Sequence, residues 1–267
     1  MIVAEALQPK KTEARNLIRR IRRKIRLPAP LFKMASHSKP RFECPICHYQ
    51  GPFRDMDYFA GRRLHAECPQ CGSLERHRLQ YLVVMEILDG RDLSKWRMLH
   101  CAPEPFLSKI FSSRVCQYET ADISKKGVQH HVDLQNLPFK DGTYDFIFAS
   151  HVLEHIPDDN KAIKEIRRVL KAGGIAILPV PIVCEKTIEY EEPNPHESYH
   201  MRAPGLDYFD KYRPHFAKVE SRNSADMPEK YQIYIYEDRT LWPTPECPLR
   251  PPMPGRRHID FVPICYA

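Results

Sequence analysis

Hydrophobic residues in the middle of the chain form short unbroken runs, separated by a stretch with helical periodicity. Residues 146–149 are strand-forming apolar residues, which predicts a strand buried on both faces, as in a parallel sheet. Residues 160–170 place apolar side chains at helical spacing, with charges between them. The pair Gly173-Gly174 predicts the end of this helix, and residues 175–180 the next buried strand. Together they form a βαβ unit of about 35 residues, whose ligands bind beyond the carboxyl ends of the strands.

The same pattern predicts further elements on both sides of this unit. Residues 79–88 are an apolar-rich helix, residues 98–101 are the first strand, and a second strand ends at Asp122. Residues 231–236 alternate with period two, which predicts an antiparallel edge strand late in the sheet. The proline-rich tail, residues 241–267, is predicted to wrap the surface without regular structure.

Two Cys-x-x-Cys pairs precede the predicted sheet. With twenty residues between the pairs, the spacing is that of a tetrahedral Zn²⁺ site whose ligands are Cys44, Cys47, Cys68 and Cys71. Four thiolates leave no open position for a substrate, so we expect this zinc to be structural. A ribbon of about 30 residues is too small to hold a core without its metal. His48 and His65 are expected to be bystanders.

Composition narrows the class of protein. A chain of 267 residues with 42% hydrophobic residues suits one large domain, alone or with a small one. No apolar run approaches the ~18 residues of a membrane span, and no signal-peptide core is apparent. Four of the nine cysteines lie in the two pairs, and the total is odd, which favours metal and free thiols over a disulfide framework. We therefore expect a cytoplasmic protein.

The net charge of +7 is concentrated in the first 40 residues, which carry eleven Lys and Arg against two Glu. Residues 13–26 predict a basic amphipathic helix, which suits an anionic membrane surface, where the protein would be peripheral, or a nucleic acid. Two alternatives stay open: the isoleucine stripe packs on the domain, or the segment is a mitochondrial presequence, against which Glu5 and Glu13 count.

Residues 144–158, which end in Leu-Glu-His-Ile-Pro-Asp, and residues 165–174, Glu-Ile-Arg-Arg-Val-Leu-Lys-Ala-Gly-Gly, carry a family resemblance. They resemble the second half of a class I S-adenosylmethionine-dependent methyltransferase domain of type 11. The cysteine pairs, residues 73–78 (Ser-Leu-Glu-Arg-His-Arg) and residues 99–104 (Leu-His-Cys-Ala-Pro-Glu) resemble a bacterial-type group of zinc-ribbon methyltransferases. This second resemblance covers roughly residues 42–240.

The resemblance implies an α/β fold, namely a three-layer Rossmann-like methyltransferase sheet with an N-terminal zinc ribbon. We divide the chain accordingly into a basic arm (1–40), a zinc ribbon (41–75), a class I methyltransferase domain (76–240) and the tail (241–267). The implied cofactors are S-adenosylmethionine and a structural Zn²⁺.

Candidate cofactor contacts follow the predicted strands. The family usually carries a Gly-x-Gly-x-Gly loop after the first strand, but this chain has no glycine there: Ala102 is small enough for close approach, and Glu104 could accept a hydrogen bond from the cofactor's ammonium group. Asp122 suits the two ribose hydroxyls. By the resemblance, Asp133 receives the adenine amino group and Leu134 lines the base. Either aspartate could instead cap a turn.

Ser150 and His151 end the central strand and are expected to face a ligand. Methyl transfer is an in-line displacement, in which orientation supplies much of the rate and a base is needed only when the acceptor keeps its proton. His151 is a candidate base, although in the family a residue at this place often only contacts the cofactor. His155 is a second catalytic candidate, and Glu154 before it could simply favour a helix N-terminus.

Residues 189–202 are rich in Glu, Pro and His, which predicts an insertion that covers the cofactor and selects the acceptor. His196, His200 and Arg202 are the substrate-side candidates, the last two by resemblance to the family's His-x-Arg. A metal site of His196, Glu197 and His200 is conceivable, but loop histidines without tighter spacing rarely bind one. The basic residues of 76–78 could bind an anionic substrate or cap the ribbon.

These observations predict an enzyme that moves a methyl group from S-adenosylmethionine to an oxygen or nitrogen of a small molecule or glycan. Two alternatives stay open. One is an RNA methyltransferase with a zinc finger, which the lack of net positive charge after residue 40 disfavours. The other is a non-catalytic, zinc-dependent binding module with a degenerate methyltransferase fold, which the glycine-free loop favours.

Overall fold

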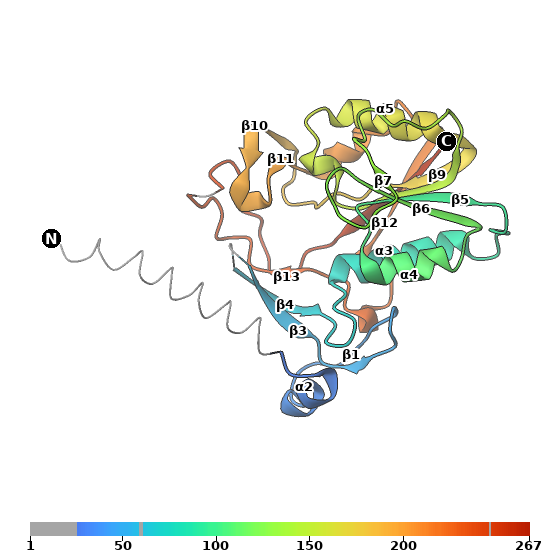
Figure 1. Ribbon diagram of the computed structural model, residues 1–267. Coiled ribbons are helices and arrows are strands. Elements are labelled where there is room, and N and C mark those ends of the chain that lie inside the picture. Colours follow the sequence, from blue (N-terminus) through green and yellow to red (C-terminus); the bar gives the residue numbers. More distant parts are fainter. Residues whose placement is uncertain (1–25, 59–60, 246) are drawn as a thin grey trace.

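A seven-stranded mixed sheet forms the centre of the protein in a computed structural model, which describes residues 26–58, 61–245 and 247–267. Its strand order is β12-β14-β9-β8-β5-β6-β7 (Figure 1). The bounds are β5 (Arg97–Cys101), β6 (Gln117–Asp122), β7 (His130–His131), β8 (Tyr144–Ala149), β9 (Leu170–Ile177), β12 (Lys218–Asn223) and β14 (Phe261–Tyr266). The strands from β7 to β9 are parallel and have the 3-2-1-4-5 order of a doubly wound sheet, so the predicted Rossmann-like sheet is confirmed.

Helices cover both faces of the sheet (Figure 1). On one face lie α3 (Glu75–Leu88) and α4 (Pro105–Ser112), and on the other α5 (Asp159–Val169) and η4 (Leu206–Lys211). Side chains of β8 alternate between them: Phe146 and Phe148 pack with α3 and α4, whereas Ile147 and Ala149 pack with α5. Full burial of each large apolar side chain stabilises the fold by roughly 1.5–3 kcal/mol. The three-layer prediction is therefore confirmed.

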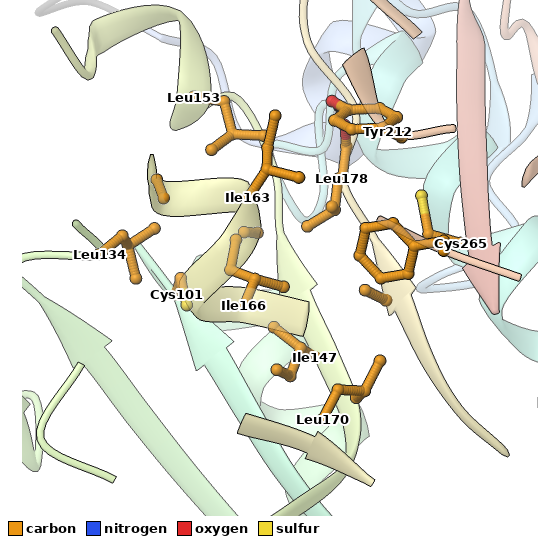
Figure 2. Packing of buried hydrophobic residues seen from close by; sticks show 14 of the residues in the cluster. Cys101, Leu134, Ile147, Leu153, Ile163, Ile166, Leu170, Leu178, Tyr212 and Cys265 are labelled. Atoms are coloured by element: carbon orange, nitrogen blue, oxygen red, sulfur yellow. Dashed lines mark hydrogen bonds between the residues drawn. The ribbon is translucent and has the colours of Figure 1, made fainter. Parts of the chain in front are cut away.

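The core on the α5 side joins segments from the whole domain (Figure 2). Ile163 and Ile166 of α5 pack over Ile147, and Tyr212 and Cys265 close the cluster. The Tyr212 hydroxyl donates a hydrogen bond of 2.7 Å to the carbonyl of Leu178, which satisfies its only polar group inside the core.

The C-terminal tail corrects one prediction. Residues 241–267 were expected to lack regular structure, but β14 lies inside the sheet, antiparallel to both β9 and β12. Cys265 pairs with Ala176 on one side and with Val219 on the other. The six-residue strand contains Pro263, and a proline within a short apolar run argues against an inner strand. Pro263 is tolerated because the pairing with β9 ends at Ile264.

Two other boundaries also differ. Residues 231–236 were predicted to be an edge strand of the main sheet, which is wrong: η6 (Glu229–Tyr231) is followed by β13 (Tyr236–Glu237), which pairs with β4. The helix of 160–170 was expected to end at Gly173-Gly174. Instead α5 ends at Val169 and β9 starts at once, with Gly173 at a positive φ of 74° where the β8–β9 register shifts.

Residues 41–75, here called the cysteine unit, contribute strands to two small sheets. One pairs β1 (Phe42–Glu43) with β2 (Gln50–Gly51), and the other places β4 (Gly61–Glu67) between β3 (Arg54–Tyr58) and β13. A short helix, α2 (Ala29–Ala35), precedes the unit. The predicted basic helix of residues 13–26 lies almost entirely outside the described residues, so its proposed partners stay predictions. In the described ranges, no helix combines the length and apolar character that a membrane crossing needs.

Arg78 of α3 joins the cysteine unit to the domain. Its side chain is fully buried and donates hydrogen bonds to four carbonyls: those of Ala66 and Ser73 in the unit, and those of Tyr231 and Gln232 late in the chain. The guanidinium also lies 4.5 Å from the centre of the Phe53 ring. Of the two roles considered for this basic stretch, Arg78 therefore has the structural one.

The predicted insertion is a β-hairpin, not an irregular loop (Figure 1). It pairs β10 (Ile188–Asn194) with β11 (His200–Ala203) around η3 (Pro195–Glu197). The hairpin lies against η2 (Leu153–His155), which follows β8. The remaining short helix is η5 (Ser224–Asp226). The chain thus carries two structures, the cysteine unit and the hairpin, near the carboxyl end of β8.

A charged cavity at the strand ends as candidate active site

The winding of the sheet reverses between β5 and β8. From β5 the chain proceeds outward through β6 to β7, and from β8 it proceeds the other way to β9. The two strands end side by side, with Cys101 opposite Ala149, so Ala102 and His151 follow the strands that flank the switch point. Ligands of doubly wound sheets bind in the crevice at this place.

Ala102 adopts the backbone conformation that the family's glycine would usually take in the loop after β5. Its φ is 49°, in the left-handed region that costs a residue with a side chain roughly 1–2 kcal/mol. Its N–H donates to the carbonyl of Ala121 at the end of β6, over 2.8 Å. The loop after β5 therefore has a backbone conformation that usually requires glycine, with only one methyl group at the turn.

Glu104 lies at the N-cap of α4, between two histidines. Its carboxylate oxygens are 3.3 Å from Nε2 of His100 and 3.7 Å from Nε2 of His77. The His77 Nδ1 accepts the N–H of Leu74, so its proton is on Nε2. Burial lowers the pKa of both histidines, and that of His77 well below its usual range. Both rings are therefore neutral at pH 7, and the Glu104 carboxylate beside them has oxygen atoms that suit a hydrogen bond from an ammonium group.

Asp122 and Asp133, the two candidate cofactor ligands, both cap turns, as the alternative interpretation of the sequence allowed. Oδ1 of Asp122 accepts the N–H groups of Ser124 and Lys125, each over 2.8 Å. Asp133 accepts the backbone N–H of Gln135 over 2.8 Å and also contacts the side-chain amide of Gln135. Among the described residues, nothing engages Oδ2 of Asp122, so this oxygen remains free for a ligand hydroxyl.

Two candidate cofactor contacts are buried. Leu134 is 6% exposed and belongs to the core under α5, as Figure 2 shows. Ser150 is 4% exposed, and its hydroxyl donates over 2.9 Å to Gln80 of α3. The expectation that the Ser150 side chain faces a ligand is therefore wrong, because α3 covers it.

A cavity of about 480 Å³ opens beside His151. Its walls come from β3 and β4 of the cysteine unit, the start of α3, the segments after β8 and β9, the β10–β11 hairpin and residues 235–260. Volumes of this size suit a small molecule or a sugar-sized group. The cavity thus lies between the sheet and both of the structures that the chain adds to it.

Four arginines line this cavity, and three of them are paired. Arg250 forms an ion pair with Glu197 at 2.5 Å, while Arg239 and Arg63 share Glu237 at 3.0 and 3.5 Å. Arg76 is different: in the described part of the chain, its buried Nε has no hydrogen-bond partner. Burial lowers the pKa of Arg76, whereas the carboxylates of Glu104, Glu75 and Asp260 raise it without a close ion pair among the described residues. Arg76 is therefore the cation available to an anionic ligand.

His151 has a strained backbone and a free ring nitrogen. Its φ is 53°, and its N–H donates to the carbonyl of Pro179 over 2.9 Å. Nε2 is buried with no hydrogen-bond partner within the described ranges, and Nδ1 is 3.5 Å from Oε1 of Glu154. Burial, with the nearby charge of Arg76, lowers the pKa of His151 well below its usual range. The ring is therefore neutral at the cavity wall.

Glu154 is fully buried next to three histidines. Neither of its carboxylate oxygens has a hydrogen-bond partner among residues that the structure describes. Oε1 lies 3.9 Å from Nε2 of His155 and 4.0 Å from Nε2 of His200. Burial raises the pKa of Glu154 to about 8 and lowers that of His200 to about 3. The sequence also allowed Glu154 simply to favour a helix N-terminus. However, α5 starts later in the chain and is capped by Asp158, so Glu154 does not stand at its start and belongs instead to the cluster with the histidines.

The substrate-side candidates separate into different places. His200 lines the cavity, whereas His196 is exposed and lies outside its walls. Arg202 is 3% exposed: it pairs with Glu189 at 2.7 Å and donates to the carbonyls of Leu153 and Ile156. Arg202 was expected to bind substrate, but its Nε pairs with Glu189 inside the hairpin and its other hydrogen bonds join the hairpin to the segment after β8, so the structure gives it a structural role.

The four cysteine sulfurs of the cysteine unit converge within 4.8 Å of one another. Sγ of Cys44 is 3.7 Å from that of Cys71, and Sγ of Cys47 is 3.6 Å from that of Cys68. These distances exclude disulfides, whose sulfurs are about 2.05 Å apart. A tetrahedron with Zn–S bonds of about 2.3 Å has edges of roughly 3.8 Å. The sulfur arrangement therefore fits a Zn²⁺ ion.

Comparison with known proteins agrees with this fold. Residues 107–178 match a family model described as a methyltransferase domain. The demethylmenaquinone methyltransferase of Staphylococcus haemolyticus is 32% identical over 96 residues, 36% of this chain and 35% of that protein. The sterol 4-C-methyltransferase of Caenorhabditis elegans is 44% identical over 62 residues, 23% of this chain and 18% of that protein. The chain thus spans about a third or less of these relatives.

Among solved structures, an S-adenosylmethionine-dependent methyltransferase from Mesorhizobium loti is similar with a TM-score of 0.48 and 13% identity, covering 70% of this chain and 97% of that one. The family match begins within α4 and ends at the residue after β9, so it includes β8 on one side of the switch point but not β5 on the other. The matched segment and the sequence relatives indicate a methyltransferase domain in this part of the chain.

Proposed function

We propose that this protein transfers the methyl group of S-adenosylmethionine to an oxygen or nitrogen of a small-molecule or glycan acceptor in the charged cavity. The observation that carries the proposal is the place of His151. It stands at the carboxyl end of β8, beside the switch point, and its free Nε2 is in the cavity wall. A cofactor in the crevice and an acceptor in the cavity would then meet at this residue.

The residues of the crevice suit the parts of the cofactor. When bound, S-adenosylmethionine supplies a methyl group activated by its sulfonium sulfur. The positive φ of Ala102 leaves room for close approach of the methionine part, and the Glu104 carboxylate offers an acceptor for its ammonium group. Arg76 offers its guanidinium to the carboxylate at the same end. Asp122, at the end of β6, would receive a ribose hydroxyl through Oδ2.

His151 would accept the acceptor's proton, because a neutral imidazole with an unpartnered nitrogen is ready to do so. Its Nδ1 faces Glu154, which would fix the orientation of the ring. An acceptor whose nitrogen has already lost its proton would need only positioning. The four cysteines would hold a structural Zn²⁺ and so stabilise the cysteine unit. Arg63 of β4 in this unit and Glu237 of β13, which pairs with β4, would then keep their places in the cavity wall.

Isothermal titration with S-adenosylmethionine tests the proposal. We expect one saturable site per chain, and Asp122→Ala should weaken its affinity by roughly ten- to a hundredfold, because a hydrogen bond to a charged group contributes about 1.5–3 kcal/mol. Ala102→Gly should retain the affinity, since glycine adopts the left-handed conformation without strain.

Asp141→Ala is the matched control, because Asp141 is exposed and precedes the amino end of β8, at the opposite edge of the sheet. Equal affinity of Asp122→Ala and the natural protein would remove Asp122 from the site. Absence of any binding heat, with no thermal shift by S-adenosylhomocysteine, would favour the non-catalytic binding module.

A further inference from the structure

The buried Glu154 carboxylate faces three histidines, of which only His151 has a role in the proposed methyl transfer. It is 0% exposed and has no hydrogen-bond donor in the described parts of the chain, yet nitrogen atoms of three histidines lie within 4.0 Å of Oε1. Burying an unpaired carboxylate costs several kcal/mol unless a partner compensates. The guanidinium groups of Arg76 and Arg202 act on this carboxylate electrostatically but form no hydrogen bond with it, so its oxygens and the three histidine nitrogens are ligand atoms that a cation could join.

The chain fixes these ligand atoms from two separate elements. Glu154 and His155 come from η2, and His200 begins β11. Arg202, two residues after His200, donates to the carbonyls of Leu153 and Ile156, which flank Glu154 and His155. The buried arginine therefore ties the two elements together at the place where the three side chains meet.

Backbone strain next to His200 also indicates a ligand site at this cluster. Ser198 and Tyr199, immediately before His200, have φ values of 59° and 64°. Residues with side chains in this region cost about 1–3 kcal/mol each, and such strain gathers at ligand sites. The turn places His200 against His155, with ring centres 4.6 Å apart and planes at 88°. Two perpendicular rings at this distance can direct both Nε2 atoms toward one point.

We propose that Glu154, His155 and His200 bind one divalent transition-metal ion. Their ligand atoms lie within 4.8 Å of one another. Neighbouring ligands with bonds of about 2.1 Å are roughly 3.0–3.5 Å apart, so each group has to move inward by less than about 1 Å. His155, whose side chain is 38% exposed, has room to make this movement. Two imidazoles and one carboxylate suit Zn²⁺, Co²⁺, Fe²⁺ or Mn²⁺ rather than Ca²⁺.

The ion would have open coordination positions toward the cavity. Glu154, His155 and His200 all line its wall, and three protein ligands leave room for one or more further donors. An acceptor with an oxygen donor could bind there and present its hydroxyl to His151. This use of the ion rests on the proposed methyl transfer, whereas metal binding itself does not.

Titration with Co²⁺ tests the site on the full-length protein after one equivalent of Zn²⁺ has been bound by the cysteines. We expect one further equivalent of Co²⁺ to bind, with visible d–d absorption but no thiolate-to-cobalt charge transfer, because the ligands are nitrogen and oxygen. His200→Ala and Glu154→Gln should each weaken this binding by at least tenfold.

His196→Ala is the matched control, because His196 belongs to the same hairpin but lies outside the cluster and should leave binding within twofold. His155→Ala, a change of a partly exposed residue, serves if the buried Glu154→Gln does not fold. No d–d absorption, or unchanged Co²⁺ affinity in His200→Ala and His155→Ala, would overturn the proposal. Binding of S-adenosylmethionine in the same samples separates this outcome from failure of the proposed function.

Discussion

Cys68→Ser is expected to abolish zinc binding and to unfold the cysteine unit. Cys68 is 0% exposed, and its sulfur lies 3.6 Å from that of Cys47. The unit holds only a small apolar cluster around Tyr49 and Phe53, so the metal must supply most of its stability. Structural zinc contributes about 10–16 kcal/mol of apparent binding energy in small domains, so we expect a loss of at least about 5 kcal/mol.

Elemental analysis and limited proteolysis check this result. The natural protein should contain one tightly held zinc and resist cleavage in residues 41–75, and the variant should do neither. Cys116→Ser is the matched control, because Cys116 is an exposed cysteine outside the cluster. A Cys68→Ser protein with full zinc content and an unchanged thermal midpoint would contradict the structural role of the metal.

Arg78→Met is expected to lower the free energy of unfolding by about 4 kcal/mol. Methionine fills a similar volume but removes the hydrogen bonds to four carbonyls. That of Ser73 still accepts the N–H of Cys68, whereas each buried carbonyl left without a donor costs about 1–3 kcal/mol. Removing a buried charge returns part of this energy, because its desolvation no longer has to be offset. Arg78→Lys should also destabilise, since one ammonium cannot reach carbonyls on both sides.

Urea denaturation measures this difference. Arg91→Met is the control: Arg91 is exposed just beyond the end of α3, where a substitution should change stability by less than about 0.5 kcal/mol. A loss below about 1 kcal/mol in Arg78→Met would mean that Arg78 does not hold the cysteine unit on the domain.

The predicted part of the fold is the part whose pattern is local. The strand at Phe146, the helix around Ile166 and the helix that follows the cysteines are each recognisable within a dozen residues. The inner strand β14 is not, because Pro263 and its proline-rich surroundings hide it, and because its partners β9 and β12 are supplied by distant segments. The short strand β13 is similar, since its only partner is β4 in the cysteine unit.

The residues of the candidate site also separate into those that local sequence predicts and those that it does not. Ala102 and His151 were predicted because they directly follow predicted strands, although no feature of the sequence signals their positive φ values. Arg63, Arg239 and Arg250 were missed because they reach the cavity from the cysteine unit and the C-terminal region. The spacing of residues along the sequence does not show that these arginines come together, because only tertiary contacts bring them to the cavity.

We expect the cofactor to bind at the switch point between β5 and β8 with its reactive end toward the cavity. A crystal structure of the complex with S-adenosylhomocysteine would show whether it does. We predict that the ribose lies beside Asp122, the amino-acid part beside Ala102 and Glu104, and the sulfur toward His151. Binding of the ligand elsewhere, or an empty crevice at saturating ligand concentration, would contradict cofactor binding at the switch point.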